Sequence, residues 1–133
     1  MTTLLLLLLC APPSPTLTVE VTGFRSSAGH ALARLYLPGM DVTKTPARTV
    51  AAPILEGRAH FELESLAWGD YALVVVHDEN DNGEIDHGVL GLPREPLGFS
   101  GGFRLGLFSG LPTFEKLRFA FSERALRVAL EVR

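Results

Sequence analysis

Cysteine is nearly absent from this chain, because Cys10 is the single one among 133 residues. An intramolecular disulfide is therefore excluded, and an apolar core has to hold the fold together. The 47% apolar content suits one globular domain. An excess of positive charge is also missing, since 12 Lys and Arg residues stand against 15 Asp and Glu for a formal net charge of −3. Without a basic patch to attract phosphates, we expect no nucleic acid partner.

Apolar runs long enough to span a bilayer are missing too, and the most uniform apolar run is the six leucines of residues 4–9. This run is far shorter than the ~20 residues of a transmembrane helix, but it is typical of the apolar part of an export signal. Cys10 and a Pro-rich stretch follow it. Residues 1–15 are therefore interpreted as a signal peptide, or as a lipoprotein signal with a short tether.

Three alternatives stay open for this N-terminal segment. Cys10 is lipidated, or it is lost with a cleaved signal peptide, or the start is wrongly assigned, since no Lys or Arg precedes the leucines. The first two predict an exported protein that is periplasmic, extracellular or anchored in the envelope. Contact with a membrane is expected only through a lipid on Cys10.

Amphipathic helical patterns are scarce, and alternation with period 2 takes their place. The segment "TLTVEVTG" puts three apolar side chains on one face, and the run Tyr71 to Val76 is apolar on both faces, as in a central strand. The pattern predicts an all-β fold for residues 16–133, a single antiparallel β-sandwich of about seven strands. Strands are expected at 17–22, 31–37, 59–63, 71–76, 117–121 and 126–132, with the first two forming a hairpin and 40–53 forming a loop or irregular edge.

A cluster of oxygen ligands follows the most strand-like segment. Counted from Asp78, oxygen side chains stand at positions 1, 3, 5 and 9 and Gly83 at position 6, as in EF-hand-type calcium loops. Val89 stands at position 12, where such loops carry a bidentate Glu, so calcium binding is expected to be weak. The alternative is an ion-free turn, because Asn-Gly favours type I′ turns and Asp and Asn cap their own loops. The predicted metal ligands are Asp78, Asn80, Asn82, Asp86 and the carbonyl of Glu84.

Catalysis and sugar binding are two further hypotheses. Ser100, His77 and a carboxylate from Asp78 or Glu95 are the residue types of a Ser-His-acid hydrolase, although no strained strand-to-helix nucleophile elbow is predicted at Ser100. A zinc enzyme would instead draw ligands from the His and Asp residues on either side of the loop. Aromatic side chains that stack on sugar rings are the third possibility, and the alternative is that they pack inward. The residues concerned are His77, His87, Asp78 and Asp86 for zinc, and Trp68, Tyr71, Phe99, Phe103 and Phe108 for sugars.

Three spaced blocks carry a resemblance to a known family. They are "HDENDNGEID" from His77 to Asp86, "GLPRE" from Gly91 to Glu95 and "GFS" from Gly98 to Ser100. In this order they resemble the bacterial family called domain of unknown function 2141. The resemblance implies an exported sandwich that is transthyretin-like or carbohydrate-binding-like, and it implies no established activity. The chain departs from the family in "GGFRLGLFSG", where members usually carry Asn-rich residues.

These features together favour a non-catalytic binding or structural module of the cell envelope with a calcium-binding loop. Its ligand is expected to be a carbohydrate or another envelope protein. The alternative is a small hydrolase or metal-dependent enzyme that uses His77 and Asp78.

Overall fold

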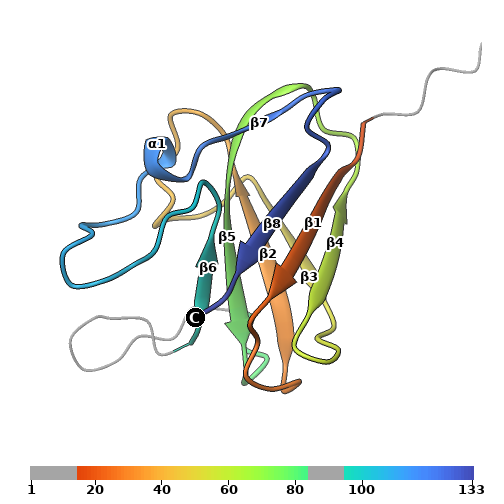
Figure 1. Ribbon diagram of the computed structural model, residues 1–133, viewed down its shortest axis with the longest axis vertical. Helices are drawn as coiled ribbons and strands as arrows, with labels where there is room; N and C mark the ends of the chain where they lie inside the picture. The colour runs from red at the N-terminus through yellow and green to blue at the C-terminus, as the bar shows by residue number, and fades with distance from the viewer. Residues whose placement is uncertain (1–14, 84–94) are drawn as a thin grey trace, which may run out of the picture.

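The computed structural model describes residues 15–83 and 95–133, whose regular structure is almost entirely β. A single helical turn interrupts the strands near the C-terminus (Figure 1). The elements are β1 (Leu17–Thr22), β2 (His30–Tyr36), β3 (Arg48–Ala52), β4 (Ala59–Leu63), β5 (Gly69–Asp78), β6 (Leu97–Phe99), α1 (Phe114–Leu117), β7 (Phe119–Phe121) and β8 (Arg127–Glu131).

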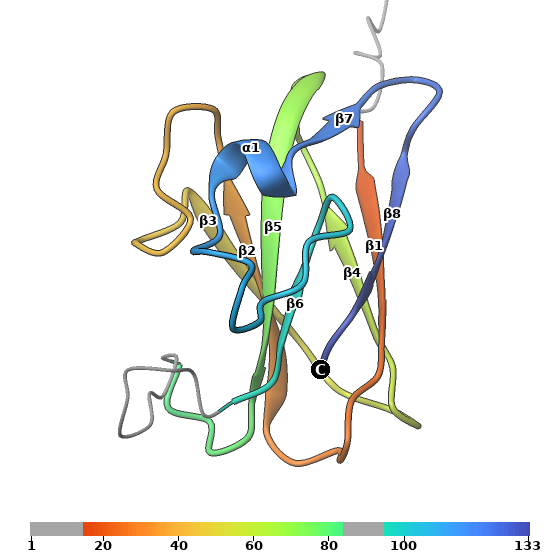
Figure 2. The same cartoon turned by 60° about the vertical axis from the view of Figure 1, so that its left-hand side comes forward.

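Two sheets pack face to face, as Figures 1 and 2 show from two sides. The smaller sheet has the order β4-β1-β8, and the larger has the order β3-β2-β5-β6 with β7 paired to the start of β5. Most neighbours are antiparallel, but β1 and β8 run parallel. The predicted β-sandwich is therefore confirmed, with eight strands among the described residues.

Strand β5 is buried on both faces, as its unbroken apolar run predicted. Leu73 and Val75 face the core between the two sheets, where they belong to the same apolar cluster as Val19 of β1. Val74 and Val76 face the opposite way, into a second apolar cluster under α1 and the loops that cover the outer face of the larger sheet. Burial on two sides makes β5 the rigid centre of the molecule.

The predicted hairpin between the first two strands is wrong. Strand β1 pairs with β4 and β8, whereas β2 pairs with β3 and β5 in the other sheet. The connection crosses between the sheets, and its Phe24 is buried in the core. Alternation fixes which face of a strand is apolar, but both strands bury one face in the same core, so it does not choose their partners.

Three local predictions also differ from the structure. Part of the segment 40–53, which was expected to be a loop or irregular edge, forms β3, a regular edge strand that pairs with β2 and has Ala52 as its one buried side chain. Leu117 belongs to α1 and not to a strand, because the Thr113 side chain accepts the N–H of Lys116 at 3.3 Å and starts a helical turn. Leu126 is 44% exposed because it lies just before β8 begins. Within the described ranges, no helix is long and apolar enough to cross a bilayer.

Candidate functional site

The buried polar side chains of the described residues all bind the backbone. His77 Nε2 donates to the carbonyl of Ala28 at 2.9 Å, and Glu95 Oε2 accepts the N–H of Glu79 at 2.8 Å. Such partners are what buried polar groups require, and among the described residues the one buried side-chain atom without a partner is His77 Nδ1. These side chains also belong to the motif blocks from which catalysis and metal binding were predicted. They are His77, Asp78, Glu95 and Ser100.

Ser100 pins three segments together rather than serving a histidine. Its Oγ accepts the N–H of Leu73 at 2.8 Å and donates to the carbonyl of Leu117 at 2.6 Å. Leu73 and His77 stand four residues apart on β5, which is roughly 13 Å along an extended strand. The Ser100 hydroxyl therefore lies out of hydrogen-bond reach of His77, and the structure does not bring the two into a Ser-His-acid arrangement.

Asp78 ends β5 and holds the turn that follows it. Its Oδ2 accepts the N–H of Gly83 at 2.8 Å, and its Oδ1 accepts the N–H of Asn82 at 3.2 Å. The side-chain oxygen of Asn80 accepts the same N–H of Asn82 at 3.3 Å. A carboxylate and an amide that cap their own loop are what the ion-free interpretation predicts.

The calcium interpretation stays a prediction. The structure gathers Asp78, Asn80 and Asn82 in one turn, but the other two predicted ligands, Glu84 and Asp86, lie outside the described residues, as does His87 of the zinc hypothesis. In the described part of the chain, no group of three or more His, Cys, Asp or Glu residues could hold a metal ion.

The turn after β5 is tied to the connection between β1 and β2. Arg25 forms an ion pair with Glu79, and His30 Nδ1 lies 2.6 Å from Asp81 Oδ1. Gly29 has a φ of +65°, and a Cβ there would lie 1.8 Å from the carbonyl oxygen of Asp78. Only glycine allows this approach, so this end of the sandwich is closely packed.

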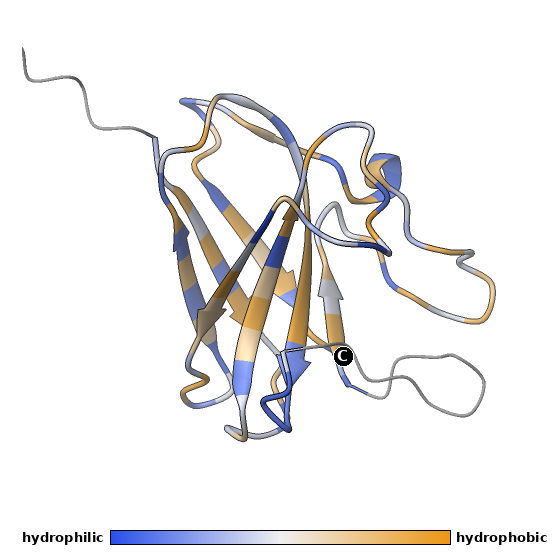
Figure 3. Cartoon of the chain, turned by 180° about the vertical axis from the view of Figure 1, so that it is seen from behind, coloured by the Kyte–Doolittle hydropathy of each residue, from blue (hydrophilic) through white to orange (hydrophobic). Residues whose placement is uncertain are grey.

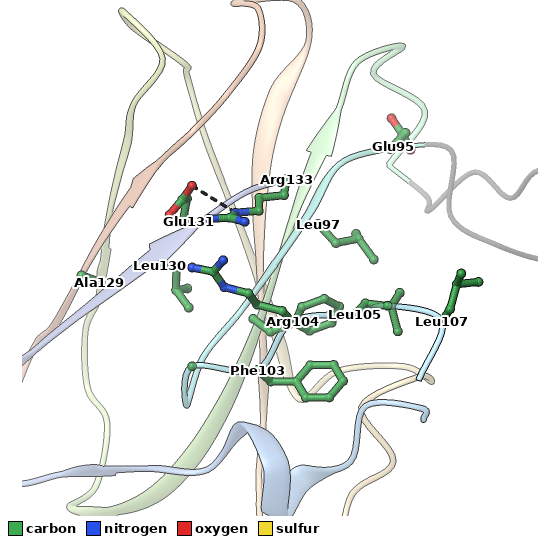
Figure 4. A pocket seen from close by; sticks show the side chains of 13 residues that line it. Glu95, Leu97, Phe103, Arg104, Leu105, Leu107, Ala129, Leu130, Glu131 and Arg133 are labelled. Atoms are coloured by element: carbon green, nitrogen blue, oxygen red, sulfur yellow. Dashed lines mark hydrogen bonds and ion pairs between the residues drawn. The ribbon is translucent and has the colours of Figure 1, made fainter. Parts of the chain in front are cut away.

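A cleft of about 600 Å³ opens at a different place, between β6, residues 102–107 and β8 with the residues after it. Figure 4 shows its lining, in which Arg104, Glu131 and Arg133 lie toward one end and Leu97, Leu105 and Leu107 toward the other, with Glu95 apart from the other charged residues. The volume lies within the range of small-molecule sites, which are mostly apolar with a few polar groups. The apolar part includes Leu97, Phe103, Leu105 and Leu107, and the charged residues are Glu95, Arg104, Glu131 and Arg133.

The cleft forms where the edges of the two sheets separate. Strand β6 is an edge of the larger sheet and β8 an edge of the smaller one. They meet at Leu97 and Arg133, whose backbone groups exchange hydrogen bonds of 3.3 and 3.1 Å. Gly98 makes the approach possible, because a Cβ there would lie 2.9 Å from the carbonyl oxygen of Glu131. The loop after β6 supplies the remaining wall of the cleft through residues 102–107.

The five aromatic residues proposed for sugar stacking are scattered. Phe99 and Phe103 line the cleft, with ring centroids 5.2 Å apart and an edge-to-face arrangement. Tyr71 is buried and donates its hydroxyl to the carbonyl of Ala67, and the half-exposed Trp68 ring packs against Phe121. Phe108 is fully exposed on the loop beside the cleft. Aromatic type alone did not locate one common site.

The sequence prediction missed Leu97, Leu105, Arg104 and Arg133 of the cleft. The segment "GGFRLGLFSG" could have indicated this part of the cleft wall. Its apolar side chains lie on a Gly-rich loop, where no regular strand or helix places them in a core. Figure 3 shows this loop protruding from the sandwich with apolar residues over its tip.

The family model described as "Uncharacterized protein conserved in bacteria (DUF2141)" matches residues 19–129. The chain belongs to this family. Comparison with curated proteins and with solved structures gives no match. The described residues of the DUF2141-like blocks, from His77 to Gly83 and from Glu95 to Ser100, supply the backbone contacts above, whereas the departing segment after Ser100 contributes part of the cleft wall.

Proposed function

We propose that the protein is an exported, non-catalytic binding module of the cell envelope, and that its ligand occupies the cleft between β6, residues 102–107 and β8. The observation that carries this proposal is the cleft itself, about 600 Å³ in volume and lined by apolar side chains with a charged end. Sites of this size and composition are the usual places for small ligands.

The division of polar residues supports a binding role over a catalytic one. Asp78, Glu95 and Ser100 direct their side-chain oxygens to backbone groups, which leaves them holding loops in place. Arg104 and Leu105 face the cleft and lie on a loop, where binding residues commonly occur. No contact among the described residues favours the hydrolase alternative.

A thermal-shift screen of the purified protein tests the binding role. The compounds should span several classes, including oligosaccharides, alkyl carboxylates, alkyl alcohols and short peptides. We expect at least one class to raise Tm by about 2 °C or more, because a ligand that binds the folded chain stabilises it.

Blocking the cleft supplies the decisive variant. Ala129 lines the cleft, so Ala129→Phe should fill part of it and abolish the rise in Tm. Ala51→Phe is the matched control, since Ala51 is an exposed strand residue of β3 on the far edge of the larger sheet. A rise that survives in Ala129→Phe would place the ligand elsewhere, and a screen in which no class stabilises the protein would contradict the binding role.

A further inference from the structure

The charges at the polar end of the cleft do not cancel. Arg133 Nε donates to Glu131 Oε1 at 3.2 Å, so these two side chains compensate each other. Glu95 accepts the N–H of Glu79 with a carboxylate oxygen and lies at the other end of the cleft from Arg104 (Figure 4). Within the described ranges, no ion pair involves Arg104. Arg104 therefore has no carboxylate partner in the described part of the chain, and a guanidinium is suited to bind an anionic group.

The apolar end of the cleft continues onto exposed surface. Leu105 is 38% exposed and Leu107 is 92% exposed, although both line the cleft. Phe108, next along the loop, is 100% exposed. Exposed apolar side chains in sequence beside a cleft are a common mark of a ligand or partner surface. A ligand with a long apolar part would run from the cleft over Leu107 and remove the Leu105 and Leu107 side chains from water.

A sugar fits this lining less well than an alkyl chain does. Phe103 is the half-buried ring of the cleft, and its ring already has Phe99 against it in an edge-to-face contact and Lys116 Nζ at 5.6 Å from its centroid. The remaining apolar wall is aliphatic, from Leu97, Leu105 and Leu107. Flexible aliphatic side chains suit a flexible chain, whereas sugar rings favour open aromatic faces and several neutral hydrogen-bonding groups.

We propose that the cleft binds a free amphiphile, an alkyl chain with one negatively charged group, with the anion at Arg104 and the chain along Leu97, Leu105 and Leu107. This inference rests on the proposed binding role and names its ligand class. The same chemistry occurs in the anionic lipids of a bilayer, so the two sources have to be separated by experiment.

Isothermal titration of the purified protein with decanoate, below its micelle concentration, is the direct test. Hexanoate and decanol are the matched ligands, because one keeps the charge with a shorter chain and the other keeps the chain without the charge. We expect decanoate to bind about tenfold or more tightly than either, since each buried methylene and the charged contact add affinity. Sedimentation with phosphatidylglycerol vesicles is the bilayer arm, and we expect no binding there.

Two pairs of variants locate the contacts. Arg104→Gln should weaken decanoate about tenfold and leave decanol unchanged, whereas Arg124→Gln, an exposed arginine in the turn before β8, should alter neither. Leu105→Ser should weaken both ligands, whereas Leu126→Ser, of similar exposure and outside the cleft, should weaken neither. Equal effects of Arg104→Gln and Arg124→Gln would overturn the assignment of the anion.

The inference and the binding role fail in different ways. Decanol binding as tightly as decanoate, an oligosaccharide competing at the cleft, or vesicles binding while decanoate does not would each overturn the amphiphile and leave the cleft as a site. A protein whose Tm responds to no class of compound would overturn the binding role itself.

Discussion

At the scale of single residues, the polar motif of this chain is a set of backbone clamps. Asp78 accepts two N–H groups of the turn after β5, Glu95 accepts one from Glu79, and Ser100 joins β5 to α1. A buried acceptor that satisfies N–H groups stabilises a loop that would otherwise expose them or leave them unpaired. Residue types that sequence reasoning assigns to chemistry can therefore serve the fold.

Calcium addition discriminates between the two interpretations of the Asp78 turn. If the loop binds calcium, the Asn ligands and the absent Glu at position 12 predict a Kd on the order of 10⁻⁴–10⁻³ M. Millimolar calcium should then stabilise the wild-type protein by about 0.4–1.4 kcal/mol and raise its Tm modestly. The same addition should have no effect on a variant with Asp78→Ala and Asp86→Ala. An equal shift in both proteins, or a shift in neither, would establish the ion-free turn.

His60 provides a pH-dependent contact on the outer face of the smaller sheet. Its Nδ1 lies 2.6 Å from Glu20 Oε1 and its Nε2 lies 3.3 Å from Glu62 Oε1. These hydrogen bonds, chiefly that with Glu20, raise the pKa of the His60 imidazole above its usual range. A raised pKa in the folded state means a stabilising contribution that is complete below the unfolded pKa of about 6.5 and is lost as pH rises through the folded pKa.

An NMR titration of the imidazole resonances checks this contact. Glu20→Gln should lower the pKa of His60 toward its usual value, because the main hydrogen-bonded carboxylate is removed. Glu64→Gln is the control, since Glu64 is exposed and is not a partner of His60. An unchanged pKa in Glu20→Gln would show that the contact with Glu20 does not persist in solution.

At the scale of elements, β5 determines how the molecule is layered. Val75 is fully buried and belongs to the core between the sheets. Val75→Ala should lower the free energy of unfolding by about 1–3 kcal/mol, through lost burial and an unfilled cavity. Thr49→Ala on the exposed side of β3 should change it far less. Urea unfolding measures both, and an unchanged midpoint for Val75→Ala would argue against a core position.

The apolar patterns of β1, β4 and β5 could be predicted because each buries a regular face. Strand β3 was expected only as a loop or irregular edge, since most of its side chains are exposed or half-buried and it is held mainly by its backbone pairing to β2. The strands that pair with β1 and β2 could also not be predicted from the sequence, because the alternation of a strand is the same whichever strand lies beside it. The cleft was missed for a related reason: it lies between two sheet edges, and its walls come from segments about 25 residues apart, around Arg104 and Leu130.

At the scale of the whole molecule, the start of the described chain and the cleft lie at different ends of the sandwich. Strand β1 begins at the end of the sandwich away from the point where the chain ends, beside which the cleft opens (Figures 1 and 2). The first described residues and the cleft therefore lie toward different ends of the sandwich.

The mass of the protein recovered from the cell envelope tests the export prediction. We expect the mature chain to begin at Cys10 or shortly after it, because the leucine run ends there and a Pro-rich stretch follows. Full-length protein in the cytosol that retains Met1 would contradict export. An envelope protein without acyl chains would remove only the lipid anchor.

Mapping the ligand onto the chain tests most directly whether function lies in the cleft. The measurement is a ¹H–¹⁵N spectrum of the purified protein with and without the compound that stabilises it most. We predict that amide shifts concentrate at residues 97–107 and 129–133, around the cleft walls. Shifts that concentrate instead at residues 25–30 and 78–83 would place the site at the Asp78 turn and contradict the cleft as the binding site.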